Sequence, residues 1–88
     1  MSNSVSAKVY PNPANNSFFV KIYYDGEGDY ALSVRDLFGK EVINDKYKGS
    51  DLPEFEVNTN DLKNGIYFLV VSIMDNKLKG TYRVVILK

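Results

Sequence analysis

The chain has 88 residues, 44% of them hydrophobic, and its 11 basic and 11 acidic side chains leave no formal net charge. It contains no Cys and no His, which excludes Cys- or His-ligated zinc sites and catalysis that depends on either residue. The zero net charge argues against nucleic-acid binding driven by phosphate neutralisation. No apolar run approaches the length of about 18 residues that a membrane-spanning helix needs.

The first residues, Met1 to Ser4, show neither the charged nor the apolar region of a signal peptide. We therefore expect either a cytosolic chain or a fragment of a longer protein that carries an added Met. Residues 1–7 are assigned to a starting segment or linker that includes possible first-strand residues. Residues 8–88 are assigned to one domain, since this length suits a single hydrophobic core.

Turn residues recur at short spacing, and most segments between them alternate apolar and polar residues, which is typical of an all-β sandwich or barrel. Seven strands and no helix are predicted, over residues 5–10, 17–24, 30–37, 41–48, 54–58, 65–74 and 78–88. Pro11 and Pro13 end the first strand because proline cannot donate to a ladder. The predicted fold is an immunoglobulin-like antiparallel β-sandwich of about seven strands, with a small β-barrel as the alternative.

Alternation within the strands predicts which side chains face the core. The expected inward residues are Phe18, Val20, Ile22, Tyr24, Leu32, Val34, Phe55 and Val57. Segment 65–74 is almost wholly apolar, which indicates a central strand covered on both faces. We therefore expect Tyr67→Ala and Val70→Ala each to destabilise the domain by roughly 2–4 kcal/mol.

Several positions between and within the strands have a predicted structural role. Asp36, at the end of a strand, is expected to accept backbone N–H groups in a turn. Gly39 suits a turn that needs a positive φ. Gly65 is expected to let the chain enter a crowded central strand, where Tyr67 fills the core and donates its hydroxyl to the backbone. Residues 59–64 predict a turn or a single helical turn capped by Thr59 or Asn60.

Two patterns resemble ligand or modification sites but have a simpler structural interpretation. Residues 25–29 place three acids at alternate positions, as at the front of a calcium loop, but Tyr30 stands where glycine is needed and Asp36 closes the pattern. We interpret them as a solvated acidic hairpin loop and expect no metal or cofactor. Residues 15–17 form an N-glycosylation sequon that is equally consistent with a plain turn.

Aromatic and charged residues leave alternatives open. Packing explains the tyrosines at least as well as a sugar-binding platform made by Tyr10, Tyr23, Tyr24 and Tyr30. Residues 51–62 hold four acids and no base, whereas residues 76–88 hold four bases and no acid. These segments are either two solvated strands that pair or lie near each other, or a basic C-terminal edge strand offered to a partner. An exposed edge strand of this kind also predicts a strand-exchanged dimer.

Four motifs follow one another along the chain: Val9 to Ala14, Leu32 to Val42, Val57 to Tyr67 and Arg83 to Lys88. In this order and spacing they resemble the type A C-terminal sorting domain of the type IX secretion system of Bacteroidota. The resemblance covers residues 8–88. The residues that carry it are Tyr10, Pro11, Asn12, Pro13, Asp36, Gly39, Lys40, Leu62, Gly65 and Tyr67.

The resemblance implies an immunoglobulin-like β-sandwich at the C-terminus of a larger cargo protein, in agreement with the strand count. It implies a non-enzymatic signal that the translocon recognises in the periplasm, so that the cargo crosses the outer membrane to the cell surface or the medium. A sortase-like peptidase is then expected to remove the domain near its N-terminal boundary. The residues expected to contact the translocon are Lys79, Arg83, Val84, Val85, Ile86, Leu87 and Lys88. The alternative function is an accessory carbohydrate- or protein-binding module of a cell-surface enzyme, because one sandwich fold hosts many functions.

Overall fold

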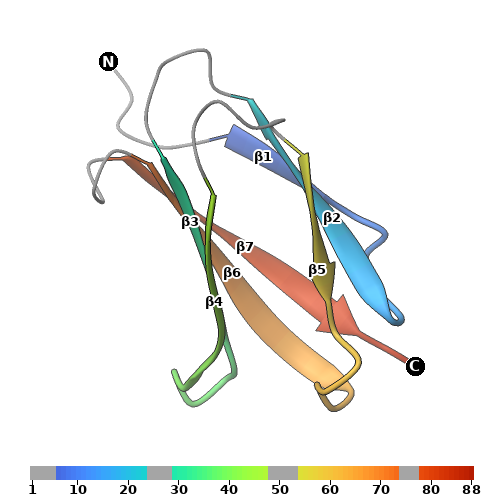
Figure 1. Cartoon of the computed structure of the whole chain (residues 1–88). Coiled ribbons are helices and arrows are strands. Elements are labelled where there is room, and N and C mark those ends of the chain that lie inside the picture. The colour runs from blue at the N-terminus through green and yellow to red at the C-terminus, as the bar shows by residue number, and fades with distance from the viewer. Residues whose placement is uncertain (1–5, 24–28, 48–53, 74–77) are drawn as a thin grey trace.

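In the residues that the structure describes, seven strands form two antiparallel sheets that face each other (Figure 1). The structure is a computed structural model that describes residues 6–23, 29–47, 54–73 and 78–88. The strands are β1 (Ser6–Tyr10), β2 (Ser17–Tyr23), β3 (Tyr30–Arg35), β4 (Glu41–Tyr47), β5 (Glu54–Asn58), β6 (Gly65–Ile73) and β7 (Leu78–Ile86). One sheet has the order β1-β2-β5 and the other β4-β3-β6-β7. The predicted sandwich is confirmed, and no helix occurs within these described ranges.

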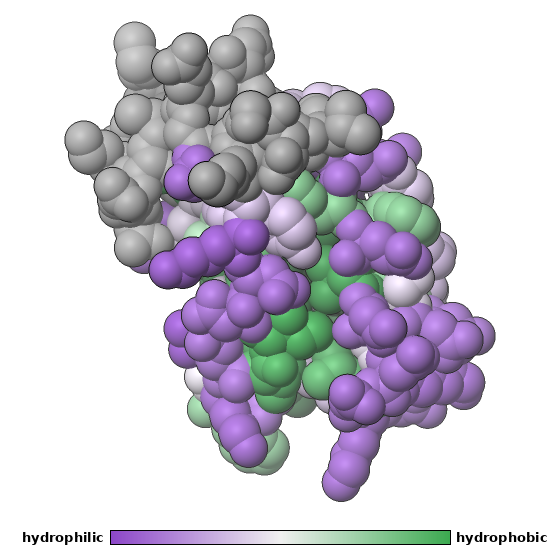
Figure 2. All heavy atoms as spheres, in the orientation of Figure 1, coloured by the Kyte–Doolittle hydropathy of each residue, from purple (hydrophilic) through white to green (hydrophobic). Residues whose placement is uncertain are grey.

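The core lies between the two sheets and consists of the alternate residues of each strand. Phe18, Val20, Leu32 and Val34 are at most 1% exposed, and Phe55 and Val57 follow the same alternation. This confirms the expected inward set for the described strands, while Tyr24 lies outside the described residues. The rings of Tyr47 on β4 and Phe55 on β5 pack across the two sheets with their centroids 4.0 Å apart. Figure 2 shows hydrophobic residues between the two sheets, with hydrophilic residues on either side.

The prediction that β6 is covered on both faces is wrong. The strand is central, between β3 and β7, and Leu69 and Val71 on its inner face are fully buried. On its outer face Ile66 is 37% exposed and Val70 is half-buried. The outer face is apolar without a second layer over it in the described structure. A continuous apolar run therefore marked the centre of the sheet but not the burial of both faces.

Residues 59–64 form a turn, the first of the two expected alternatives, and not a helical turn. The side chain of Asn58 accepts the N–H of Asn60 (2.8 Å). Thr59 is fully buried, and its hydroxyl donates to the carbonyl of Asn15 (2.8 Å). Thr59 therefore does not cap a helical turn. Its hydroxyl instead joins the turn 59–64 to the turn 11–16.

The described parts of the predicted acidic and basic segments, residues 54–62 and 78–88, do not pair as strands. β5 lies in the three-stranded sheet, and β7 is the edge of the four-stranded sheet. The turns 11–16, 36–40 and 59–64 nevertheless lie at the same end of the sandwich as the C-terminus (Figure 1). Within the described ranges, no helix is long and apolar enough to cross a membrane.

Candidate functional site

The first and last motifs meet along the outer edge of β7. The Asn12 side chain binds the β7 backbone as a neighbouring strand would: its Oδ1 accepts the N–H of Val85 (3.0 Å), and its Nδ2 donates to the carbonyl of Arg83 (3.0 Å). Ala14 continues this edge, because its N–H donates to the carbonyl of Val85 (2.7 Å) and its carbonyl accepts the N–H of Leu87 (2.8 Å). The turn that precedes β2 thus pairs with the end of the chain.

The third motif holds the terminal residue. The backbone N–H of Lys88 donates to the side-chain oxygen of Asn64 (2.9 Å), and its ammonium donates to the carbonyls of Asn60 (2.9 Å) and Leu62 (2.5 Å). We call this set of contacts, made by Asn12, Ala14, Asn60, Leu62 and Asn64 with residues 83–88, the C-terminal clasp. It joins three of the four sequence motifs at one place.

The clasp corrects the expectation of an exposed C-terminal edge strand. β7 is at the edge of its sheet, but from Arg83 to Leu87 its outward backbone groups bind Asn12 and Ala14. Unpaired strand edges are templates for other strands. In this domain, the part of that edge nearest the C-terminus is already occupied.

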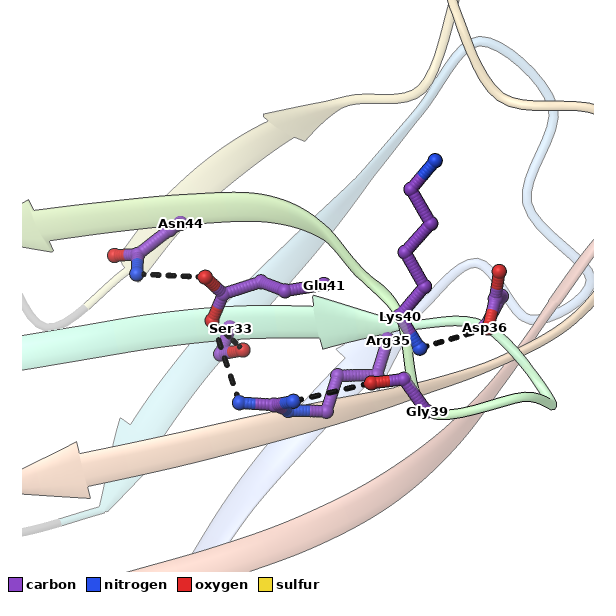
Figure 3. A network of polar contacts seen from close by, with 7 residues as sticks. All are labelled: Ser33, Arg35, Asp36, Gly39, Lys40, Glu41 and Asn44. Atoms are coloured by element: carbon purple, nitrogen blue, oxygen red, sulfur yellow. Dashed lines mark hydrogen bonds and ion pairs between the residues drawn. The ribbon is translucent and has the colours of Figure 1, made fainter.

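The second motif builds the β3–β4 turn (Figure 3). One oxygen of the Asp36 carboxylate accepts the N–H groups of Phe38 (2.8 Å) and Lys40 (3.0 Å), as predicted. Gly39 has the expected positive φ, at 85°. A turn closed by its own backbone leaves its tip to solvent, and the side chains of Leu37 and Phe38 are 61% and 96% exposed.

A polar network lies beside this turn on the outer face of the four-stranded sheet (Figure 3). Glu41 accepts hydrogen bonds from Ser33 Oγ (2.5 Å) and Asn44 Nδ2 (3.0 Å), and lies 3.6 Å from the Arg35 guanidinium. The Ser33 bond above all, with the Asn44 bond and the Arg35 charge, holds the pKa of the Glu41 carboxyl below its ordinary value of 4.5. Arg35 also donates to the carbonyl of Gly39 (3.1 Å), so its position is fixed from two sides.

The remaining family positions support the core near this end. Tyr67 is 8% exposed and donates its hydroxyl to the carbonyl of Lys63 (2.8 Å), which confirms its predicted role. Gly65 does not sit in a crowded place, because an added Cβ would come no closer than 3.9 Å to the Tyr67 ring. Its φ of 157° is the feature that a side chain would disfavour there.

The residues expected to contact the translocon fall into two groups. Val84 and Ile86 are fully buried in the core, so in the folded domain they act through packing. Lys79, Arg83, Leu87 and Lys88 are exposed, and Val85 is half-buried. The outward set therefore alternates along β7 and continues to the C-terminus.

The tyrosines named for a sugar platform are divided by the fold. Tyr30 is in the core at 4% exposure, and Tyr24 lies outside the described residues. Tyr10 and Tyr23 do share the outer face of the three-stranded sheet. Phe19 joins them there, with its ring stacked on Tyr10 at a centroid distance of 5.6 Å. Strand alternation alone places Phe19 on this outer face, so the sequence could have added Phe19 to the group of candidate sugar-binding aromatic residues.

Other candidate groups play structural parts. The hydroxyl of Tyr10 donates to Glu54, and this bond is the main reason why the pKa of Tyr10 is raised. The acids at positions 25 and 27 lie outside the described residues, and no cluster of three possible metal-ligating acids occurs in the parts described. The Asp36 carboxylate accepts backbone N–H groups within the β3–β4 turn.

The chain resembles known proteins in sequence and in fold. The family model for the secretion system C-terminal sorting domain matches residues 8–87. PorZ, a surface component of the type IX secretion system of Porphyromonas gingivalis, has a similar fold (TM-score 0.71, 18% identity) over 93% of this chain and 11% of its own. Ruminococcus gnavus β-glucuronidase is also similar in fold (TM-score 0.55, 15% identity) over 94% of this chain and 14% of its own. Comparison with curated proteins found no match. The match over residues 8–87 shows that the chain belongs to the family of secretion system C-terminal sorting domains of the type IX pathway.

Proposed function

We propose that this domain is the signal by which the translocon of the type IX secretion system recognises a larger cargo protein and moves it across the outer membrane. The family match supports this function, and the C-terminal clasp is the structural observation that carries it. Family motifs that are far apart in the sequence bind residues 83–88, which places them in one defined arrangement.

The clasp gives a physical reason for recognising a folded domain and not a loose tail. A segment held in its binding conformation loses less entropy when a partner binds it. Arg83, Leu87 and Lys88 are exposed, and the C-terminus lies at the same end of the sandwich as the β3–β4 turn, whose Leu37 and Phe38 are also exposed. The proposal includes passage through the periplasm to the cell surface or medium, and removal of the domain by a sortase-like peptidase near residues 1–7.

A secretion assay tests the proposal. We expect that a reporter with an N-terminal signal peptide, joined to residues 1–88, will be exported from a Bacteroidota host. Retention of this fusion in the periplasm, beside an exported control, would contradict the proposed function. The measurement is the reporter activity in the medium and on the cell surface against that in the periplasm.

The recognition residues need substitutions that keep the fold. Deleting residues 83–88 would remove the buried side chains of Val84 and Ile86, so lost export could simply reflect unfolding. Arg83→Glu changes one exposed charge and keeps the clasp contacts, because Asn12 binds only the backbone carbonyl of Arg83. Lys8→Glu on the other sheet is the matched control. Lower export of Arg83→Glu alone, at an unchanged melting temperature, supports recognition at the clasp. Equal export of all three proteins places recognition elsewhere.

The accessory-module alternative has one structural feature in its favour. Tyr10 and Phe19 stack on the outer face of the three-stranded sheet, and Tyr23 on the same face is 52% exposed. Exposed aromatic faces of this kind are able to stack on sugar rings. Affinity electrophoresis in polysaccharide gels would favour this alternative if retardation is lost in Tyr23→Ala and kept in the control Phe38→Ala.

A further inference from the structure

The outer face of the four-stranded sheet contains a hollow of about 350 Å³. Its floor follows from strand register: Ala31 pairs with Lys46 on β4 and with Ser72 on β6, and Ser72 pairs with Lys79 on β7. Two small residues therefore stand between two lysines on the opposite edges of the sheet. Ser33 and Val70 extend the floor by one more row.

This face is cationic although the whole chain has no net charge. Alternate side chains of a strand point to opposite faces, and on this face the described strands present Arg35, Lys46, Lys79 and Arg83. The acid that they present here is Glu41, which already binds Ser33, Asn44 and Arg35. The outer face of the other sheet is balanced, with two lysines in β1 and β2 opposite two glutamates in β5.

The cations are spread along the hollow and do not converge on one point. Lys46 and Lys79 stand on strands separated by three strand spacings, or about 14 Å between backbones. Arg35 lies two rows further along β3 and is held by Gly39 and Glu41, as Figure 3 shows. One small anion cannot contact all three, whereas an extended chain with several carboxylates can.

We propose that this hollow binds an acidic segment of a protein partner in an extended conformation. Carboxylates on one face of the extended segment would bind Lys46, Lys79 and Arg35. A concave floor suits a chain better than a flat lipid surface. The described lining also contains no aromatic ring on which a nucleic-acid base could stack. The proposed binding does not depend on the sorting function, because the side chains of Lys46, Lys79 and Arg35 make none of the contacts of the clasp.

A defined peptide tests the proposal with the full chain. The probe is a fluorescent ten-residue peptide that alternates Glu and Val, and its control has Gln in place of Glu. We expect the Glu peptide to bind, with amide chemical-shift changes around Ala31, Ser33 and Ser72. Lys46→Glu with Lys79→Glu should weaken binding at least about tenfold, because attraction becomes repulsion. Lys8→Glu with Lys21→Glu, on the other sheet, should change it by less than about twofold.

Other outcomes would overturn the proposal. The proposal is wrong if the Glu peptide does not bind, or if the Gln peptide binds with equal affinity. It is also wrong if both double variants lose affinity equally, or if the amide chemical shifts change on the three-stranded sheet instead. Binding of duplex DNA or phosphatidylglycerol vesicles at these lysines, without binding of the Glu peptide, would also reject a protein partner. Melting curves check that each variant folds. Lys46→Gln with Lys79→Gln replaces the charge-reversal variant if that protein unfolds.

Discussion

Replacing Leu69 with alanine should lower the free energy of unfolding by about 2–5 kcal/mol, whereas replacing its neighbour Val70 should cost no more than about 1 kcal/mol. The two residues are adjacent in β6 but point to opposite faces. Leu69 is fully buried between the sheets, so its truncation leaves a cavity. Val70 is half-buried on the outer face, so solvent fills the space that its methyl groups leave.

Urea denaturation followed by far-ultraviolet circular dichroism measures both values, since the chain contains no Trp. For a domain of this size, the Leu69→Ala change should lower the melting temperature by more than about 10 °C. Val70→Ala is the matched control, because it changes the same strand by a similar removal of methyl groups. Equal losses for the two variants would mean that the outer face of β6 is covered, as the sequence pattern had indicated.

That pair of residues also shows what alternation can and cannot predict. In β2 and β5 every second residue is apolar, so the strand, its inner face and its buried residues follow from the sequence. In β6 both faces are apolar, so the period of two disappears. The choice between one covered face and two depends on whether another layer lies over the sheet, and no local pattern contains that information.

The candidate site was predictable in part for a similar reason. Asp36, Gly39 and Tyr67 act on residues within four positions in the chain, so their roles followed from turn chemistry and strand geometry. Asn12 binds Val85, which is 73 positions away. Its role depends on the turn before β2 lying beside β7, and that arrangement follows only from the packing of the two sheets.

The cationic hollow could not be predicted from charge along the chain. Its residues come from four strands, and Lys46 and Lys79 face the same hollow only through the register of those strands. The sequence instead showed an acidic segment and a basic segment whose charges cancel. A net charge of zero therefore does not exclude binding to a charged partner, because it averages over faces that a partner contacts one at a time.

Removing the Asn12 side chain should open the end of β7 more than it destabilises the whole domain. Asn12→Ala takes away the acceptor of the Val85 N–H and the donor to the Arg83 carbonyl. Because water reaches this edge, we expect a loss of about 1–2 kcal/mol in the free energy of unfolding. Amide hydrogen exchange of Val85 should become faster by about tenfold or more, as local opening becomes easier.

Val84 is the internal control for this exchange experiment. Its N–H points toward β6 by the alternation of an antiparallel ladder, so it should change much less than that of Val85. Asn16→Ala is the matched variant, because Asn16 contacts Thr59 through its backbone carbonyl, which the substitution keeps. Equal acceleration at Val84 and Val85 would mean that Asn12 supports the domain as a whole and does not hold the strand end.

The same variant decides whether the clasp protects the edge of β7. Without the Asn12 side chain, the carbonyl of Arg83 and the N–H of Val85 become available to a strand of a second copy. Sedimentation velocity should then show dimers of Asn12→Ala at concentrations where the parent chain and Asn16→Ala are monomeric. If Asn12→Ala also stays monomeric while Val85 exchanges faster, the clasp positions the C-terminal residues but is not what prevents strand exchange. Dimers in all three proteins would instead place the contact on another edge, such as β4 or β5.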